Sequence, residues 1–222
     1  MNRKITRRLL CLSKELWAGY HSHPFVRGIA DGTLDRGKNP GIVNQDYLYL
    51  IDYARVFAIG AAKARDREAM RLFAGYVSRI LDGEMDIHKG YMQRLGISPD
   101  GAERASMALD NLTYTSYMLR VAYEEGPGEI AAAILSCALS YEVIAKEMVQ
   151  TYPACAGHSF YGEWGRGYAD PGYAQANQKL IELIERLTAD YSETQLRRLE
   201  EIFLACSRCE GAFWDMAWEM RV

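Results

Sequence analysis

The sequence has little net charge, no long uninterrupted apolar run and no regular spacing of cysteines. Its 222 residues carry a formal net charge of -3. A balance this close to neutral gives no electrostatic basis for binding nucleic acid or a membrane surface. Glu, Lys or Arg interrupts every long apolar stretch, so we expect no segment that spans a bilayer. The chain is long enough to bury one sizeable core, which predicts a single domain over residues 1–222.

The five cysteines are odd in number and form no disulfide framework, which indicates free thiols in a reducing compartment. Near the N-terminus, the apolar stretch from Leu9 to Leu12 is too short for the core of a signal peptide, and Lys14 follows it closely. We therefore expect an amphipathic first helix in a cytoplasmic protein.

The sequence also lacks internal repeats, low-complexity segments and any alternating pattern long enough for a sheet. Apolar residues instead recur at helical spacing nearly throughout, which predicts an all-α bundle of about seven or eight helices. The expected helices begin at Leu9 and at His23-Pro24 and then cover 45–66, 67–95 with a break near 64–68, 111–125, 129–149, 161–168, 171–187 and 193–218. Ser98 is expected to cap a further helix start, and Ser192 with Gln195 forms a capping-box pattern.

Cys137 lies in the middle of the most apolar predicted helix. The apolar stripe of that helix includes Ile134, Cys137, Tyr141 and Ile144, so the thiol is expected to face inward. A lone inward cysteine is usually a small core residue. A catalytic nucleophile is the alternative, and the other polar residues of the chain favour it.

Two carboxylates share inward helix faces with aromatic residues. Asp46 lies on one stripe with Tyr49 and Tyr53, and Glu210 lies among Phe213 and Trp214. Each could be a structural acid that binds a neighbouring hydroxyl. Burial among aromatic rings would instead raise the pKa of Glu210 toward the value that a general acid needs, and Asp46 could line a ligand pocket.

Tyrosine is unusually frequent, with 15 residues against 6 phenylalanines. Each tyrosine offers a flat apolar face and a hydroxyl group. Inward Tyr49, Tyr114, Tyr141 and Tyr168 would suit a planar heterocycle that forms hydrogen bonds. A core that is simply rich in tyrosine is the other interpretation.

Five motifs, taken together, resemble the TenA family (thiaminase II) in order and spacing, over residues from about 10 to 220. They are His23–Leu34, Gln45–Tyr49, Tyr114–Met118, Cys137 with Tyr141-Glu142, and Glu210–Trp214. The resemblance implies a haem-oxygenase-like helical fold without haem, metal or other cofactor, assembled as a homotetramer. It also implies a small-molecule substrate: a thiamin-derived aminomethyl-pyrimidine that is hydrolysed to hydroxymethyl-pyrimidine for thiamin salvage, with thiamin itself cleaved by the same chemistry.

The resemblance also implies roles for individual residues. Cys137 matches the family's nucleophile, Glu210 its acid/base carboxylate, and Asp46 the carboxylate that holds the amino group and ring nitrogen of the pyrimidine. Tyr114 matches an aromatic residue that stacks on the ring. The remaining matches are pocket tyrosines, namely Tyr49, Tyr141 and Tyr168. A thiol at its reference pKa of about 8.5 needs a base, which Asp46 or Glu210 could supply.

The chain departs from the family pattern in two places. The segment 38–44 replaces an aromatic-rich stretch, and Pro40-Gly41 within it is expected to delay the start of the helix that carries Asp46. Ala138 and Leu139 follow the cysteine where aromatic residues are common, which predicts a roomier pocket.

Three other interpretations remain open. Cys206 and Cys209 form a CxxC pair in the middle of a helix, which favours core thiols over redox chemistry. Glu84 and His88, with His21 and His23, could contribute to the metal site of a haem-oxygenase-like oxidase, although only one imperfect ligand pair is present. A non-catalytic pyrimidine-binding or regulatory protein of the same fold is the third.

Overall fold

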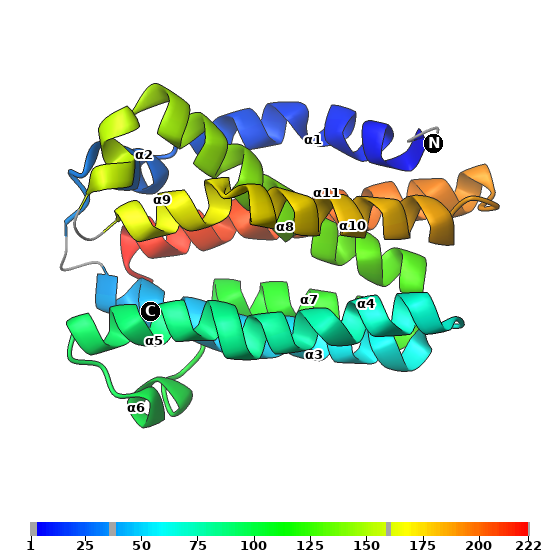
Figure 1. The fold of residues 1–222 in the computed structure, drawn as a ribbon, viewed down its shortest axis with the longest axis horizontal. Coiled ribbons are helices and arrows are strands. Elements are labelled where there is room, and N and C mark those ends of the chain that lie inside the picture. Colours follow the sequence, from blue (N-terminus) through cyan, green and yellow to red (C-terminus); the bar gives the residue numbers. More distant parts are fainter. Residues whose placement is uncertain (1–3, 36–38, 159–160, 222) are drawn as a thin grey trace.

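The structure is a computed structural model that describes residues 4–35, 39–158 and 161–221, and the described part of the chain is helical with no strand (Figure 1). This confirms the predicted all-α class. The helices are α1 (Lys4–Ser22), α2 (Pro24–Asp31), α3 (Asn39–Lys63), α4 (Arg67–Ser78), the π-helix η2 (Arg79–Glu84), α5 (Met85–Arg94), α6 (Pro99–Glu103), α7 (Leu109–Glu124), α8 (Pro127–Thr151), the 3-10 helix η3 (Pro153–Gly157), α9 (Gly162–Ala169), α10 (Pro171–Leu187) and α11 (Glu193–Glu219).

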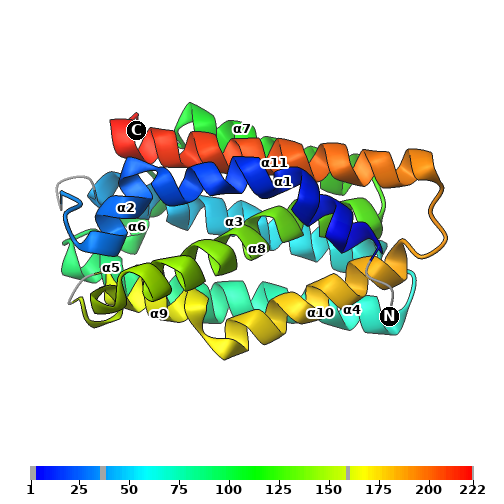
Figure 2. The ribbon, with the colours of Figure 1, turned by 90° about the horizontal axis from the view of Figure 1, so that it is seen from above.

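The helix α8 is the central element of the bundle. It packs against α11, α9, α10, α7 and α3, and it runs between the pair α1/α11 and the pair α9/α10 when the molecule is seen from above (Figure 2). By length and composition alone α8 could cross a membrane, so the expectation that no segment is long and apolar enough was wrong. Of its most apolar window, 89% is buried inside the protein. The apolar character of α8 therefore reflects its place in the core.

Side-chain caps define where several helices begin, as the sequence predicted. Ser98 and Asp170 each accept a hydrogen bond from a backbone N–H in the first turn of α6 and α10. Ser192 and Gln195 form the predicted capping box at the start of α11. These contacts satisfy backbone donors that have no partner inside the helix, and this fixes the register of the helices that follow.

The expectation that Pro40-Gly41 delays the helix of Asp46 is wrong. The helix α3 begins at Asn39, so Pro40 stands in its first turn, where a missing backbone N–H removes no helical hydrogen bond. Lys38 lies outside the described residues. Asp46 is therefore held two turns inside a regular helix, which gives its side chain a defined direction.

The predicted helix over 67–95 is divided more finely than the sequence indicated. The segment Arg79–Glu84 is π-helical and joins α4 to α5. A π-helical turn contains extra backbone and rotates the residues that follow it. This division, together with the short helix α6, gives more helices than the seven or eight expected.

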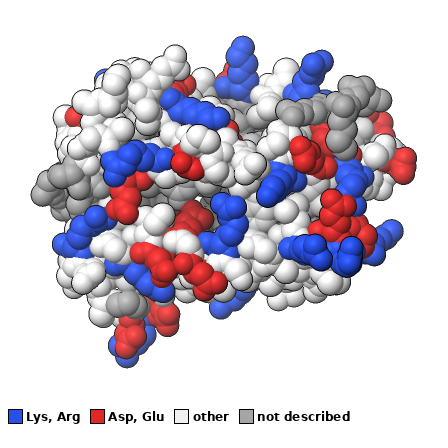
Figure 3. All heavy atoms as spheres, in the orientation of Figure 1, with Lys and Arg blue, Asp and Glu red and all other residues white. Residues whose placement is uncertain are grey.

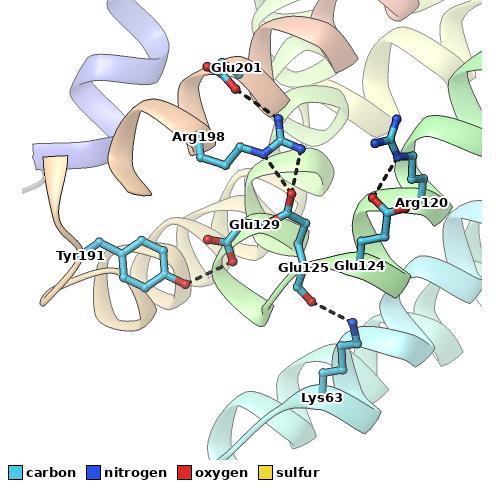
Figure 4. Close-up of polar contacts among 8 residues, drawn as sticks. All are labelled: Lys63, Arg120, Glu124, Glu125, Glu129, Tyr191, Arg198 and Glu201. Atoms are coloured by element: carbon cyan, nitrogen blue, oxygen red, sulfur yellow. Dashed lines mark hydrogen bonds and ion pairs between the residues drawn. The ribbon is translucent and has the colours of Figure 1, made fainter. Parts of the chain in front are cut away.

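A polar network ties together one end of the bundle (Figure 4). The backbone carbonyl of Glu125, in the turn between α7 and α8, accepts from Lys63 Nζ at 2.8 Å. The side chain of Glu125 accepts two hydrogen bonds from Arg198 of α11, at 2.7 and 2.9 Å. Tyr191 donates to the buried Glu129 at 3.2 Å. These contacts fix the start of α8 and hence the position of Cys137 along the axis of the bundle.

Acidic and basic side chains are interspersed over the face shown in Figure 3, without a large patch of one sign among the described residues. This distribution agrees with the small net charge of the sequence.

Candidate active site

Five helices bring the predicted site residues into one cluster in the interior of the bundle. Asp46 and Tyr49 come from α3, Tyr114 from α7, Cys137 and Tyr141 from α8, Tyr168 from α9 and Glu210 from α11. Four of the rings form two contacting pairs: the centroids of Tyr49 and Tyr114 are 5.1 Å apart, and those of Tyr141 and Tyr168 are 4.8 Å apart.

Glu210 is the polar centre of this cluster. Its side chain is 2% exposed and accepts a hydrogen bond from the Tyr114 hydroxyl at 3.0 Å. The Tyr141 hydroxyl and the Cys137 thiol lie close enough to Glu210 to lower the pKa of its carboxyl group by hydrogen bonding. Burial raises the pKa of Glu210 to about 8, and the nearby Asp46 charge adds to this, against the lowering effect of its three hydrogen bonds. Glu210 can therefore hold or release a proton near neutral pH.

Cys137 is buried near two groups that have opposite effects on the pKa of its thiol. Burial and the neighbouring Glu210 charge raise the pKa of its thiol well above the usual value. A hydrogen bond with Tyr49 lowers it. The resting thiol is therefore protonated, and the nearby Glu210 carboxylate is the candidate acceptor for its proton.

Asp46 borders a small cavity of about 70 Å³ that Tyr141, Phe213 and Trp214 also line. Its side chain is 16% exposed, and the cavity is walled mainly by apolar and aromatic residues. Desolvation there raises the pKa of Asp46 to about 7. A carboxyl group that exchanges its proton near pH 7 can pair with a heterocycle in either protonation state.

A second cavity of about 660 Å³ opens between α4, η2 and α5 on one side and α9 and α10 on the other. Tyr53, Tyr168 and Tyr173 are among the aromatic residues that line it, and Glu84 is a half-buried acid in its wall. The two cavities share His88, Tyr91 and Trp164 in their walls. Together they leave room for a ligand larger than a single ring.

Comparison with known proteins shows the family of the chain. The sequence profile of the TENA/THI-4/PQQC family matches residues 13–220. The chain belongs to this family. Two curated relatives named aminopyrimidine aminohydrolase are each 40% identical to it. The relative from Halalkalibacterium halodurans aligns over 95% of this chain and 93% of its own, and the one from Helicobacter pylori over 97% and 99%.

Solved structures agree with the family assignment. A TenA homologue from P. horikoshii OT3 is 29% identical, with a TM-score of 0.87 over 97% of this chain and 98% of its own. A domain from Shewanella denitrificans OS217 described as having a heme oxygenase-like fold superposes with a TM-score of 0.71 at 10% identity, over 98% and 91% of the two chains. At that identity the likeness concerns the fold alone, and it confirms the haem-oxygenase-like architecture.

This TENA/THI-4/PQQC chain also has polar residues near the cluster that the sequence did not assign to it. Glu84 accepts a hydrogen bond from the Tyr168 hydroxyl at 2.6 Å, and His88 Nε2 lies 3.4 Å from Asp46 Oδ2. Their spacing of four residues marked them only as possible metal ligands. Tyr53 stacks on Tyr49 at 5.3 Å and shares the stripe of Asp46, which was the available signal for it.

The histidines considered for a metal site lie in different places in this TENA/THI-4/PQQC chain. His21 pairs with Glu147 and His23 with Asp215, whereas His88 faces Asp46. Within residues 4–35, 39–158 and 161–221, no three His, Cys, Asp or Glu side chains are grouped to hold a metal ion. Cys206 is buried and Cys209 partly buried on α11, and both are free thiols.

Proposed function

We propose that the protein hydrolyses a thiamin-derived aminomethyl-pyrimidine to hydroxymethyl-pyrimidine and ammonia, as a step of thiamin salvage, and cleaves thiamin by the same chemistry. Two relatives at 40% identity over nearly the whole chain, both named aminopyrimidine aminohydrolase, support this activity. The observation that carries it is the buried position of one titratable carboxyl group, Glu210, which accepts a hydrogen bond from Tyr114 and lies near the Cys137 thiol and the Tyr141 hydroxyl.

Asp46 is proposed to bind the edge of the pyrimidine that bears the exocyclic amino group. That edge offers one N–H donor and one ring-nitrogen acceptor, side by side. A carboxyl group matches it when the pair shares a single proton, because one oxygen then accepts from the amino group while a proton links the other to the ring nitrogen. A pKa of about 7 for Asp46 makes this proton available near neutral pH.

In the proposed reaction Glu210 transfers two protons, one after the other: the first passes from the thiol to the departing amine, and the second from water to the sulfur. The Cys137 thiol gives its proton to the Glu210 carboxylate as sulfur adds to the ring, which ends the ring's aromaticity. Ring electrons then expel the amine from the exocyclic CH2, and Glu210 protonates the departing nitrogen. Water adds at the CH2 as Glu210 takes its proton. The C–S bond then breaks, and the sulfur recovers the proton from Glu210.

We further propose that the chain acts as a single domain in the cytoplasm and assembles as a homotetramer. Exposed apolar side chains on α7, namely Leu109, Leu112 and Tyr123, support an assembly that covers them. Light scattering would report the mass of the assembly in solution, and a monomeric mass would contradict the tetramer.

The proposed activity is tested by incubating the purified protein with the aminomethyl-pyrimidine. We expect ammonia and hydroxymethyl-pyrimidine to appear in equal amounts, measured by a coupled ammonia assay and by chromatography. Saturable binding of hydroxymethyl-pyrimidine without any turnover would instead indicate a non-catalytic pyrimidine-binding protein of the same fold.

Replacement of Asp46 by alanine is expected to raise KM for the aminomethyl-pyrimidine roughly 100-fold, because two polar contacts to the substrate edge are lost. Asp46→Asn should raise KM less, since its amide offers a donor and an acceptor in similar positions. Steady-state kinetics on both variants measure the difference. Equal KM values for the wild type and Asp46→Ala would show that Asp46 does not contribute to substrate binding.

A further inference from the structure

His88 is a buried histidine whose position has no role in the reaction proposed above. It lies on α5, four residues after the end of the π-helix η2, and is 5% exposed. Its ring borders both cavities of the site. A buried imidazole usually has polar partners, so the contacts of His88 indicate its role in the site.

The polar contact that the structure gives His88 is with Asp46. Its Nε2 lies 3.4 Å from Asp46 Oδ2, while its Nδ1 is buried without a hydrogen-bond partner among the described residues. Burial lowers the pKa of His88, so the ring is neutral at pH 7 and carries one proton. We place that proton on Nε2, which faces the carboxylate at 3.4 Å, because Nδ1 has no acceptor in the described part of the chain.

The neighbouring acid does not compete for this contact. Glu84, one turn before His88, accepts from the Tyr168 hydroxyl at 2.6 Å. The π-helical turn that ends at Glu84 sets the rotation of α5, and with it the direction of His88. Glu84 thus fixes Tyr168, and His88 is left to contact Asp46.

We propose that His88 is a positioning residue that holds the carboxyl plane of Asp46 in the orientation needed to bind the pyrimidine edge. A carboxylate has about four lone-pair sites, so a contact at Oδ2 leaves sites on both oxygens for the substrate. A planar, two-point contact depends on the rotation of the carboxyl group, which one fixed donor restricts. This inference rests on the proposed function, because it assigns the binding role of Asp46 to a pair of residues.

The test compares His88→Leu, which removes the donor, with His88→Gln, which keeps a side-chain N–H. We expect His88→Leu to raise KM for the aminomethyl-pyrimidine roughly 10- to 100-fold, with kcat within about threefold of the wild type. His88→Gln should recover at least half of this loss on a logarithmic scale. A purely structural role would lower kcat or thermal stability in both variants alike.

His21→Leu is the matched control. His21 also pairs with a carboxylate, Glu147, at 2.8 Å, but on a different part of the bundle. Its KM and kcat should equal those of the wild type within about twofold. An unchanged KM in His88→Leu, or a Gln variant no better than the Leu variant, would overturn the proposal.

A double-mutant cycle tests whether His88 acts through Asp46. In the Asp46→Ala background, His88→Leu should change the affinity for hydroxymethyl-pyrimidine by less than about threefold, because no carboxyl group remains to be oriented. Calorimetry measures this affinity without turnover. Additive effects of the two substitutions would overturn the proposal, whereas a wild type that binds the pyrimidine but releases no ammonia would refute only the proposed activity.

Discussion

Replacement of Cys137 by serine is expected to lower kcat for ammonia release by at least about 10⁴-fold, while hydroxymethyl-pyrimidine still binds with nearly the wild-type Kd. Serine occupies almost the same volume as cysteine, so the packing of the buried α8 should survive. Its hydroxyl is a far weaker acid and nucleophile than a thiol, and Glu210 cannot activate it at neutral pH. Rapid-quench turnover and calorimetry measure the two quantities.

Cys155→Ser is the matched control for this substitution. Cys155 is also buried, but it lies on η3, and its thiol contacts the backbone carbonyl of Ile29. Turnover in this variant should remain within about twofold of the wild type. A Cys137→Ser variant with wild-type kcat would show that sulfur does not add to the ring, and the proposed chemistry would have to be abandoned.

The sequence predicted most helices because burial imposes a regular period on them. Cys137, Tyr141 and Ile144 recur at helical spacing and lie in the core as expected. The π-helix at Arg79–Glu84 leaves no comparable trace, since one irregular turn hardly alters a hydrophobic stripe. The start of α3 was missed because Pro40 was interpreted as a breaker although it is tolerated in a first turn.

The sequence predicted which residues of the candidate site face the interior, but not which of them contact one another. Helical spacing and the family resemblance selected Asp46 and Glu210, but neither gives the angle at which their helices cross. Glu84 and His88 illustrate this limit: they are four residues apart, yet Glu84 contacts Tyr168 and His88 contacts Asp46. Such pairings depend on tertiary packing, which the spacing along one chain segment does not contain.

Replacement of Glu210 by glutamine is expected to lower kcat/KM by roughly 10²- to 10⁴-fold, because no group remains to carry the proton from the thiol to the amine. The pH profile should change with it. In the wild type, kcat/KM should rise with pH toward about 8, the pKa to which burial raises Glu210, since only the carboxylate accepts the thiol proton. Glu210→Gln should lack this rise, and a variant that keeps it would assign the ionisation to another group.

Glu129→Gln is the matched control for activity. Glu129 is a buried carboxyl group that also accepts a hydrogen bond from a tyrosine hydroxyl, that of Tyr191 (Figure 4). It lies eight residues before Cys137 on α8, about 12 Å along the helix axis. Its replacement should leave kcat/KM within about twofold of the wild type. A loss as large as that of Glu210→Gln would mean that the effect arises from general damage to the core.

The Glu210→Gln substitution should also make the protein more stable at high pH. The pKa of Glu210 rises from 4.5 to about 8 on folding, so between these values the folded chain binds the proton that the unfolded chain has lost. Stability therefore falls as pH rises through this window, by on the order of 3 to 5 kcal/mol when Glu210 is fully ionised. Glutamine carries no such penalty, so urea unfolding at pH 5 and pH 8.5 should show an advantage for Glu210→Gln that grows with pH. A stability advantage that does not change with pH would mean that burial does not raise the pKa of Glu210. Glu210 would then lack the pKa near neutral that its proposed role as base and acid requires.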